Sequence, residues 1–311
     1  MQVFTELEAV ARVQSIKSSN AIEGIVTSDD RIVAIVNQNS APLNHKEAQI
    51  AGYRDALAQI HKGHEYDDLR ERDILSLHEM MMTLSGDDLA GKYKTDDNVI
   101  LELDAQGNRR VRFRPTPAAE TRQTMEQLEL AYMEARGDAN INQLLLIPCV
   151  ILDFLCIHPF RDGNGRMSHL LSLLLLYKNG YDAGKYVSFE KQINNYTAFY
   201  YETLHQPSIG WHGNQNDCFP FMENFLSTLY MCYKELDKRF AVVHGKKVTK
   251  KARIEATIQN SLTPLSKADI CGILPDVSPT TVEVVLGEMV RTGSVKKIGQ
   301  GRGTRYICNS R

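Results

Sequence analysis

A nine-residue stretch beginning at His158 reads His-Pro-Phe-Arg-Asp-Gly-Asn-Gly-Arg and carries side chains suited to phosphate chemistry. His158 can accept a proton near neutral pH. Asp162 can hold a divalent cation that also binds phosphate oxygens. Gly163 and Gly165 let backbone amides approach an anion closely, and Arg166 adds a charged donor. The combination predicts a site for phosphoryl or nucleotidyl transfer, in which positioning and charge neutralisation supply most of the catalysis.

Each of these residues has a simpler interpretation when it is taken alone. His158 follows an apolar run and fits a core histidine, and Asp-Gly-Asn-Gly fits a tight turn or part of a calcium loop. Calcium is disfavoured because no second carboxylate or downstream glutamate falls at ligand spacing. No Walker-A sequence is present. It is the conjunction of residue types that favours catalysis.

The elements that must position this stretch are two apolar runs, residues 144–157 before it and 170–177 after it. Polar residues between two such runs are typical of a loop that joins buried elements. We expect a helix to begin at about Asn164, with its unpaired amides and positive dipole end facing an anion. Phosphate is the ligand that best fits such a helix N-terminus.

Composition indicates an ordinary globular protein of 311 residues, 43% of them apolar, with a net charge of −2. The six cysteines show no CxxC pair or metal-ligand spacing, so we expect reduced, structural thiols. The N-terminus lacks a basic region followed by an apolar stretch, and the run at Leu170 is too short to span a bilayer. These features predict a cytoplasmic protein without membrane contact.

Apolar spacing predicts a mainly helical protein with one inserted hairpin. The hairpin pairs residues 99–103 with 110–113 and turns near Gly107, and it either offers a free edge to a peptide or serves as a structural flap. On the helix over 189–204 we expect Tyr196, Tyr200 and Tyr201 at the surface. The predicted helices cover 5–21, 45–61, 68–84, 117–135, 140–157, 168–178, 189–204 and 216–244.

The C-terminal segment, residues 246–311, differs in charge from the rest of the chain. It holds twelve Lys or Arg against five Asp or Glu, a net charge of +7, which leaves −9 for residues 1–245. Three predicted helices (253–261, 266–271, 278–291) precede two short strands (295–298, 305–307), an order that resembles a winged helix-turn-helix domain of the α+β class. The helix in the recognition position contains Glu283 and Glu288 and few cations. The sequence therefore does not decide whether this segment contacts DNA or docks onto a protein.

The stretch from His158 to Arg166 resembles the Fic family motif, His-x-Phe-x-Asp/Glu-Gly-Asn-Gly-Arg, at every defined position. The resemblance extends over about residues 5–244, because the hairpin after Gly91 (residues 95–114) lies where the family has a target-binding flap. It implies an all-α Fic fold with a small β-hairpin flap. It also implies transfer of AMP from ATP to a Ser, Thr or Tyr hydroxyl of a protein, either another protein or the chain itself.

The resemblance also implies a role for each motif residue. His158 is the base that deprotonates the target hydroxyl, Asp162 binds Mg²⁺, and Phe160 anchors the loop in the core. The phosphates are held by Gly163, Asn164, Gly165 and Arg166. The phosphotransferase branch of the family, which resembles Doc toxins, replaces motif glycines, whereas both are present here. AMP transfer is therefore favoured.

The sequence Ser19-Asn-Ala-Ile-Glu-Gly24, at the end of an N-terminal helix over about residues 5–24, resembles the inhibitory motif of the same family. Judged by local sequence alone, Ser19 and Glu23 form an exposed pair on one helix face. The resemblance instead makes Glu23 regulatory, since in the family this glutamate pairs with a second motif arginine and keeps the ATP γ-phosphate from binding productively.

In this chain the position of that second arginine is occupied by His169, within the motif loop over residues 158–169. Histidine is shorter than arginine and lacks its bidentate fork. Glu23 either raises the pKa of His169 and binds it as a cation, or blocks by hydrogen bonding alone. Both alternatives predict altered inhibition and a weaker hold on the γ-phosphate.

Three functions compete at this stage. The first is a Mg²⁺-dependent protein adenylyltransferase held in check by Glu23. The second is removal of AMP by the same site, with Glu23 positioning a water. The third is a nucleotide-sensing, DNA-binding regulator whose Fic core is a ligand module, which the basic C-terminal segment and His169 would favour. Because the proton-accepting His158 is present, we rank the enzymatic hypotheses above the nucleotide-sensing regulator.

Overall fold

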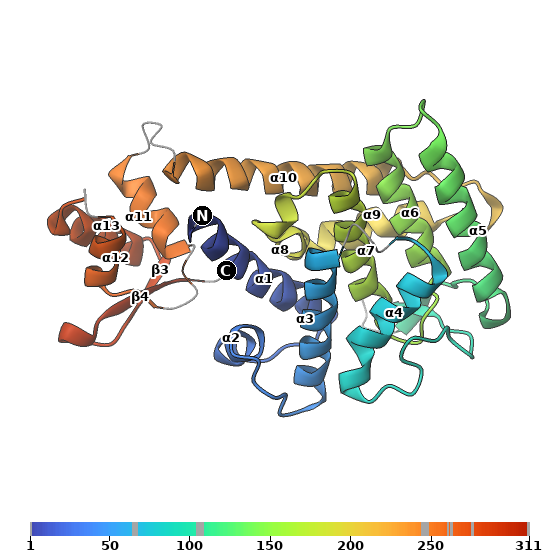
Figure 1. Cartoon of the computed structure of the whole chain (residues 1–311), viewed down its shortest axis with the longest axis horizontal. Helices are drawn as coiled ribbons and strands as arrows, with labels where there is room; N and C mark the ends of the chain where they lie inside the picture. Colours follow the sequence, from blue (N-terminus) through green and yellow to red (C-terminus); the bar gives the residue numbers. More distant parts are fainter. Residues whose placement is uncertain are drawn as a thin grey trace. The chain divides into compact units, whose positions relative to one another are not determined.

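The computed structural model describes residues 2–63, 68–103, 109–243, 249–259, 261, 264–274 and 277–309. The chain is mostly helical, with two small antiparallel hairpins (Figure 1). It divides into two compact units, one of Ala11–Cys232 and one of Met1–Val10 with Tyr233–Arg311. The predicted domain boundary at residues 245 and 246 falls outside the described residues. None of the helices in the described ranges is long and apolar enough to cross a membrane.

Most predicted helices agree with the observed bounds to within a few residues, but one short helix was not predicted and one predicted helix is divided in two. The described elements up to the end of the last long helix are fifteen. They are α1 (Gln2–Ile22), α2 (Asp29–Asn37), α3 (His45–Gly63), α4 (Glu71–Met82), η1 (Thr83–Ser85), β1 (Ile100–Leu103), β2 (Arg109–Phe113), α5 (Ala118–Gly137), α6 (Gln143–Ile157), α7 (Asn164–Lys178), η2 (Ala183–Lys185), α8 (Phe189–Asn195), α9 (Thr197–Ser208), η3 (Trp211–Gly213) and α10 (Phe219–Val243).

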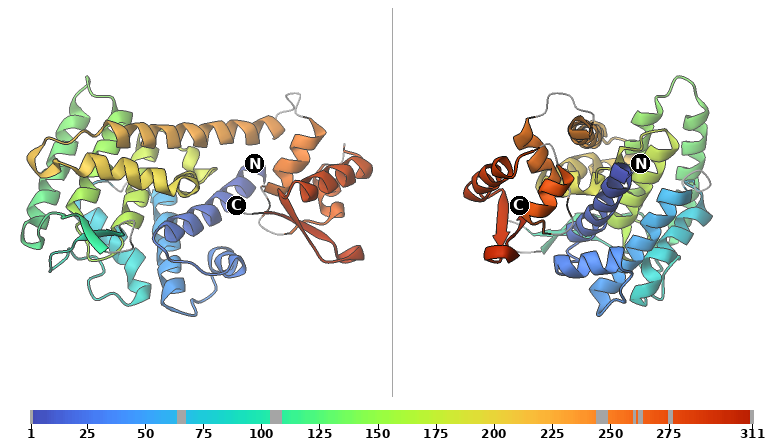
Figure 2. Two further views of the ribbon diagram at one scale, coloured as in Figure 1. Left: turned by 180° about the vertical axis from the view of Figure 1, so that it is seen from behind. Right: turned by 60° about the vertical axis from the view of Figure 1, so that its left-hand side comes forward.

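The core of the larger unit is built around α7, which packs against α3 and α6 (Figures 1 and 2). The apolar run of α7 from Leu170 to Leu176 is buried throughout, which explains why the helix has no polar stripe. The run in α6 is buried over most of its length, and Pro148 lies inside that helix. Both apolar runs are therefore buried helices, as predicted, and the motif is the loop between them.

The sequence did not predict α2. Its start is marked by Ser28, whose hydroxyl accepts a hydrogen bond from the Arg31 N–H at 3.4 Å, with two aspartates in the first turn. The helix buries Ile32 and Ile35 on one side. Its buried residues Ile32, Ile35 and Val36 recur at helical spacing, so both this period and the cap could have signalled the helix.

The single helix predicted over 189–204 is wrong, because the structure has α8 and α9 with a break between them. Tyr196 ends α8 with φ −131°, outside the helical region, and α9 starts at the next residue. The two tyrosines differ in exposure: Tyr196 is 61% exposed, whereas Tyr200 is only 8% exposed and packs in the core. The prediction that Tyr200 lies at the surface is therefore also wrong.

The predicted hairpin exists as β1 and β2, paired antiparallel with Leu101 opposite Val111. A bulge between Ile100 and Leu101 interrupts the register. Its turn at Gly107 lies among residues 104–108, outside the described ranges. After the hairpin, the ring of Phe113 stacks on that of His212, with 5.5 Å between ring centroids.

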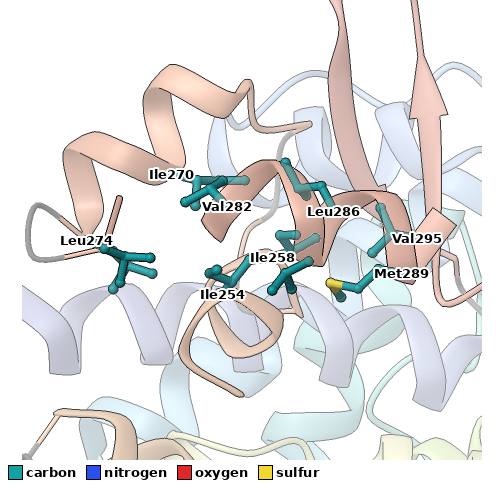
Figure 3. Packing of buried hydrophobic residues seen from close by; sticks show 10 residues of the cluster. Ile254, Ile258, Ile270, Leu274, Val282, Leu286, Met289 and Val295 are labelled. Atoms are coloured by element: carbon teal, nitrogen blue, oxygen red, sulfur yellow. The ribbon is translucent and has the colours of Figure 1, made fainter. Parts of the chain in front are cut away.

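The second unit contains α11 (Lys250–Gln259), α12 (Lys267–Ile273), α13 (Pro279–Arg291), β3 (Val295–Ile298), η4 (Gly301–Gly303) and β4 (Arg305–Cys308). Its three helices pack their apolar faces on one cluster that includes Ile254, Ile270 and Leu286 (Figure 3). Val295 continues this cluster into the antiparallel β3–β4 pair. The predicted order of three helices and a hairpin is confirmed. All six cysteines of the chain are free thiols, two of them buried.

Candidate functional site

The segment that joins α6 to α7, residues 158–163, has a residue with positive φ at each end. His158 ends α6 with φ 52° and donates its backbone N–H to the Phe154 carbonyl oxygen at 2.9 Å. Gly163 precedes α7 with φ 83°, and a Cβ at this position would lie 2.7 Å from the Cε of Met81. A left-handed histidine is an uncommon, strained conformation, often found where function constrains the backbone. Gly163 is required by its φ, since the Met81 methyl group lies at the end of a flexible side chain and could move aside.

Inside the loop, the side chain of Asn164 binds both polar groups of the Phe160 backbone. Its Oδ1 accepts from the Phe160 N–H at 2.9 Å, and its Nδ2 donates to the Phe160 carbonyl at 2.8 Å. Phe160 is fully buried. Both ends of the Asn164 amide are thus used to shape the loop, a different task from the phosphate contact that the resemblance implies for this side chain.

The sequence analysis missed His78 on α4, which contacts the loop through a hydrogen bond and a stacked ring. Its Nδ1 accepts the Gly91 N–H at 3.0 Å, so its Nε2 carries the hydrogen and donates to the Asp162 carbonyl at 3.1 Å. The ring stacks on Phe160 with 3.7 Å between centroids. Burial lowers the pKa of His78 to about 4, which keeps the ring neutral. A single histidine in a helix gives no sequence signal for this role.

Lys94 is a second support that sequence reasoning did not single out. The residue is 4% exposed, and its ammonium group donates to the carbonyls of Ile157 at 3.3 Å and His158 at 3.0 Å. It also donates to Oδ1 of Asn98 at 2.9 Å. Burial lowers the pKa of Lys94 to about 8. These bonds satisfy the last carbonyls of α6 and fix the base of the loop.

The imidazole of His158 is oriented by α6 itself. Its Nδ1 lies 3.3 Å from the Leu155 carbonyl oxygen, which can only accept, so the hydrogen is on Nδ1 and the lone pair is on Nε2. Burial is the main cause that lowers the pKa of His158 to about 4. The ring is therefore neutral at physiological pH and presents Nε2 as a proton acceptor.

Asp162 combines anchored oxygens with access to solvent. Its Oδ1 accepts the Gly163 N–H at 2.7 Å, and its Oδ2 accepts from Gln49 at 3.3 Å and from Arg166 at 3.2 Å. The side chain is nevertheless 57% exposed. A fixed, hydrated carboxylate suits Mg²⁺, which typically takes one or two carboxylates and fills its remaining positions with water and substrate phosphates. Within the described ranges, no cluster of three His, Cys, Asp or Glu could hold a metal alone.

Arg166 has the buried donors that best suit an anion. The residue is fully buried, and its Nη2 contacts Asp162 and the sulfur of Met82. Its Nε and Nη1 have no hydrogen-bond partner among the described residues. Burial lowers the pKa of Arg166, though Asp162 and Glu23 oppose this, and the group stays charged. Buried donors without partners cost free energy, and an anion at the start of α7 would satisfy them.

The carboxylate of Glu23 lies over the first turn of α7. A Cβ added to Gly165 would be 2.0 Å from Oε1 of Glu23, so only glycine permits this approach. Glu23 as a whole residue is exposed, but its carboxyl end is dehydrated by the surrounding protein, which raises its pKa, and the charge of Arg166 opposes that rise. The carboxylate thus lies at the helix start where an anion would bind.

His169 is buried and bonded to Ser19. The Oγ of Ser19 lies 2.9 Å from Nδ1 of His169, and the two residues are 0% and 2% exposed. Burial lowers the pKa of His169 to about 4. The alternative in which Glu23 raises the pKa of His169 and binds it as a cation is therefore wrong. The imidazole of His169 is neutral, and Ser19, rather than Glu23, is its hydrogen-bond partner.

Comparison with known proteins agrees with this geometry. Residues 68–176, which include the whole motif, match the model of the Fic/DOC family. The solved structures that are similar to this chain are also described as Fic proteins. A Fic family protein from Desulfovibrio desulfuricans G20 is 21% identical, with a TM-score of 0.61 over 98% of this chain and 88% of that chain.

Two further structures support the same conclusion. A Fic domain containing signaling protein from Bacteroides thetaiotaomicron VPI-5482 is 20% identical, with a TM-score of 0.59 over 75% of this chain and 94% of that chain. Fic-1 from C. elegans is 18% identical, with a TM-score of 0.56 over 72% of this chain and 62% of that chain. The fold is that of Fic proteins. No curated protein matches this chain.

The Fic fold accounts for the elements around the site. The matched region begins in front of α4, which carries His78, and ends within α7. Ser19 and Glu23 lie before the matched region, so their position over the Fic motif is a finding of the structure rather than of the family match. The all-α Fic core with its small hairpin is confirmed as the fold class of the larger part of the chain.

Proposed function

We propose that this chain is a protein adenylyltransferase that transfers AMP from ATP to a hydroxyl side chain of a protein. The observation that supports it best is the buried Arg166, two of whose nitrogens have no hydrogen-bond partner among the described residues, near a helix start that also presents His158 and Asp162. Membership of residues 68–176 in the Fic/DOC family, which includes protein AMP-transferring enzymes, points the same way.

In this proposal His158 is the general base. Its Nε2 accepts the proton of the target hydroxyl while the oxygen bonds to the α-phosphorus of ATP and the bond to pyrophosphate breaks. A neutral ring is the form that can accept this proton, and the bond from Nδ1 to Leu155 keeps that form in the correct tautomer. The imidazolium then releases the proton to water.

Arg166 and the amides at the start of α7 would hold the phosphates. The guanidinium offers its Nε and Nη1, which no residue in the described ranges binds, and Gly163 and Gly165 keep side chains away from the path of the anion. Asp162 would hold Mg²⁺, because its carboxylate is fixed by three donors yet hydrated. When bound, Mg²⁺ neutralises phosphate charge. Asn164 contributes by fixing the loop through Phe160.

Glu23 makes the described state an inhibited one in this proposal. Its carboxylate lies on Gly165, where a phosphate would have to approach, and two anions cannot share that position. Release therefore requires the carboxylate of Glu23 to move away from Gly165. Because His169 is neutral, it cannot replace the charge of an arginine toward the γ-phosphate, which predicts weaker ATP binding than an arginine would give.

The test compares Glu23→Gly with the Glu23→Gly/His158→Ala double variant. Each protein is incubated with Mg²⁺ and ATP labelled either at the α- or at the γ-phosphate, and intact mass spectrometry identifies the attached group. We expect α-label on protein with Glu23→Gly and none with the double variant. Equal α-labelling of both variants, or labelling from γ-labelled ATP alone, would exclude AMP transfer by His158.

We also propose that the C-terminal unit is a winged helix-turn-helix domain whose hairpin contacts DNA. The order α11, α12, α13, β3, β4 supports the domain type. On α13, Glu283 is paired with Lys267 and Glu288 with Lys251, so both acidic residues are neutralised. Lys296 on β3 is exposed, with no ion pair recorded in the described part of the chain.

Binding of the full chain to duplex DNA tests this second proposal. We expect affinity to fall steeply with salt and to drop when Lys296 and Lys297 are both changed to Glu, because phosphate contacts release counterions. Lys46→Glu combined with Lys62→Glu, at two exposed lysines, serves as the charge-matched control in the other unit. No retardation of DNA at low salt would exclude DNA contact and leave protein docking as the role of this unit.

A further inference from the structure

Three sulfur atoms lie together between α6 and the first turn of α10. The Sγ atoms of Cys149 and Cys218 are 3.8 Å and 3.5 Å from the Sδ atom of Met222. Because both thiols contact the same atom, they can be no further apart than the sum of these two distances, 7.3 Å. The cluster joins distant parts of the sequence, since Cys149 and Met222 are 73 residues apart.

Local structure holds the three side chains in place and leaves them within reach of solvent. The Met222 N–H donates to the Cys218 carbonyl oxygen at 3.0 Å, so these two residues are one helical turn apart and share a face of α10. Cys149 lies within α6, and its Sγ is 3.5 Å from the Leu145 carbonyl oxygen. All three sulfur-bearing residues are half-buried. Burial and, after it, the Cys218 thiol raise the pKa of Cys149 to about 12, so its thiol is protonated at neutral pH.

Two thiols and a thioether are a ligand set for a soft metal ion. Thiolate and thioether sulfur select Cu⁺, whereas Mg²⁺ and Ca²⁺ take oxygen ligands. If a metal ion lies about 2.3 Å from each of three sulfurs in a plane, the sulfurs are about 4 Å from one another. The observed separations of 3.5 Å and 3.8 Å are close to this spacing. Zn²⁺ fits less well, because it prefers four ligands, and the described residues include no group of three His, Cys, Asp or Glu that could hold it.

We propose that Cys149, Cys218 and Met222 form a binding site for Cu⁺. On binding, each of the two thiols releases its proton to water and bonds to the ion as a thiolate, and the thioether donates a lone pair without losing a proton. Copper stays Cu⁺ throughout, so no oxidant or reductant is consumed. Two thiolates and one Cu⁺ give the site a net charge of −1, which the positive end of the α10 dipole favours. His158 follows Cys149 by nine residues, about 14 Å along α6, so the proposal does not depend on AMP transfer.

Titration of the reduced, full-length protein with Cu⁺ under nitrogen, against a coloured Cu⁺ chelator, tests the site. We expect one Cu⁺ per chain, with affinity at least about a hundredfold weaker in Cys149→Ser or Cys218→Ser and about tenfold weaker in Met222→Leu, because each variant loses one soft ligand. Cys308→Ser is the matched control, at a half-buried thiol that contacts the Ser294 carbonyl oxygen, and it should bind Cu⁺ like the unsubstituted protein. Unchanged affinity in both Cys149→Ser and Cys218→Ser, or binding of Zn²⁺ but not of Cu⁺, overturns the proposal.

Two measurements on the unsubstituted protein decide the site even if a variant does not fold. Iodoacetamide alkylates accessible thiols, and mass spectrometry of the peptides reports each cysteine. Cu⁺ should protect Cys149 and Cys218 and leave Cys271 and Cys308 reactive, whereas protection of neither Cys149 nor Cys218, or equal protection of all four, overturns the proposal. X-ray absorption by the bound copper should show sulfur ligands alone at about 2.3 Å, and nitrogen or oxygen ligands would contradict the assignment.

Discussion

Lowering the pH should destabilise this protein through histidines that are held neutral in its core. His78 is 1% exposed, and its Nδ1 must stay unprotonated to accept the Gly91 N–H. Its pKa in the folded state is about 4, against 6.5 for the unfolded chain. Between these values the unfolded state binds more protons than the folded state. The stability contributed by the neutral ring is therefore present above pH 6.5 and is lost as the pH falls toward 4.

The size of the effect follows from the two pKa values. Between pH 7 and pH 5, protonation of the unfolded histidine with a pKa of 6.5, set against a folded pKa of about 4, removes about 2 kcal/mol of unfolding free energy. His169 is 2% exposed with a pKa of about 4, so it should remove a similar amount. Together the two rings predict a loss of about 4 kcal/mol.

Urea denaturation at pH 7 and pH 5 measures this loss, and substitution assigns it. His78→Gln lowers stability at both pH values, but it should reduce the difference between them by about 2 kcal/mol because the titrating group is gone. His45→Gln, at an exposed histidine, should leave the difference unchanged. If His78→Gln shows the same pH difference as the unsubstituted protein, then His78 is not held neutral by the fold.

Two substitutions in the loop should separate stability from binding. Asn164→Ala removes both hydrogen bonds to the Phe160 backbone and should lower the unfolding free energy by about 2–4 kcal/mol in urea denaturation, whereas the exposed Asn140→Ala should change it by less than about 0.5 kcal/mol. Arg166→Met removes a buried cation with unsatisfied nitrogens and should cost little stability, yet weaken ATP binding in calorimetry at least about tenfold. A severe loss of stability with unchanged ATP affinity would contradict the phosphate role of Arg166.

The sequence by itself determined the local framework of the site. The apolar runs on either side of the motif required two buried helices, and the glycines before and after Asn164 required a tight loop and an open helix start. These features depend on burial patterns and backbone preferences that adjacent residues set, so they could be predicted without a structure. The three helices and the hairpin of the C-terminal unit were predictable for the same reason.

Only the tertiary structure decided which side chains meet and which carry charge. His78 supports the Asp162 carbonyl across 84 residues, and Tyr53 reaches Glu190 across 137. The spacing of residues along the sequence does not predict such long-range contacts. The protonation of His169 was open in the sequence, since imidazole titrates near neutral pH, and the structure makes it neutral because packing removes water from both sides of the ring. Hydration and partners belong to the packed core, and they determine whether this site holds a cation or a hydrogen bond.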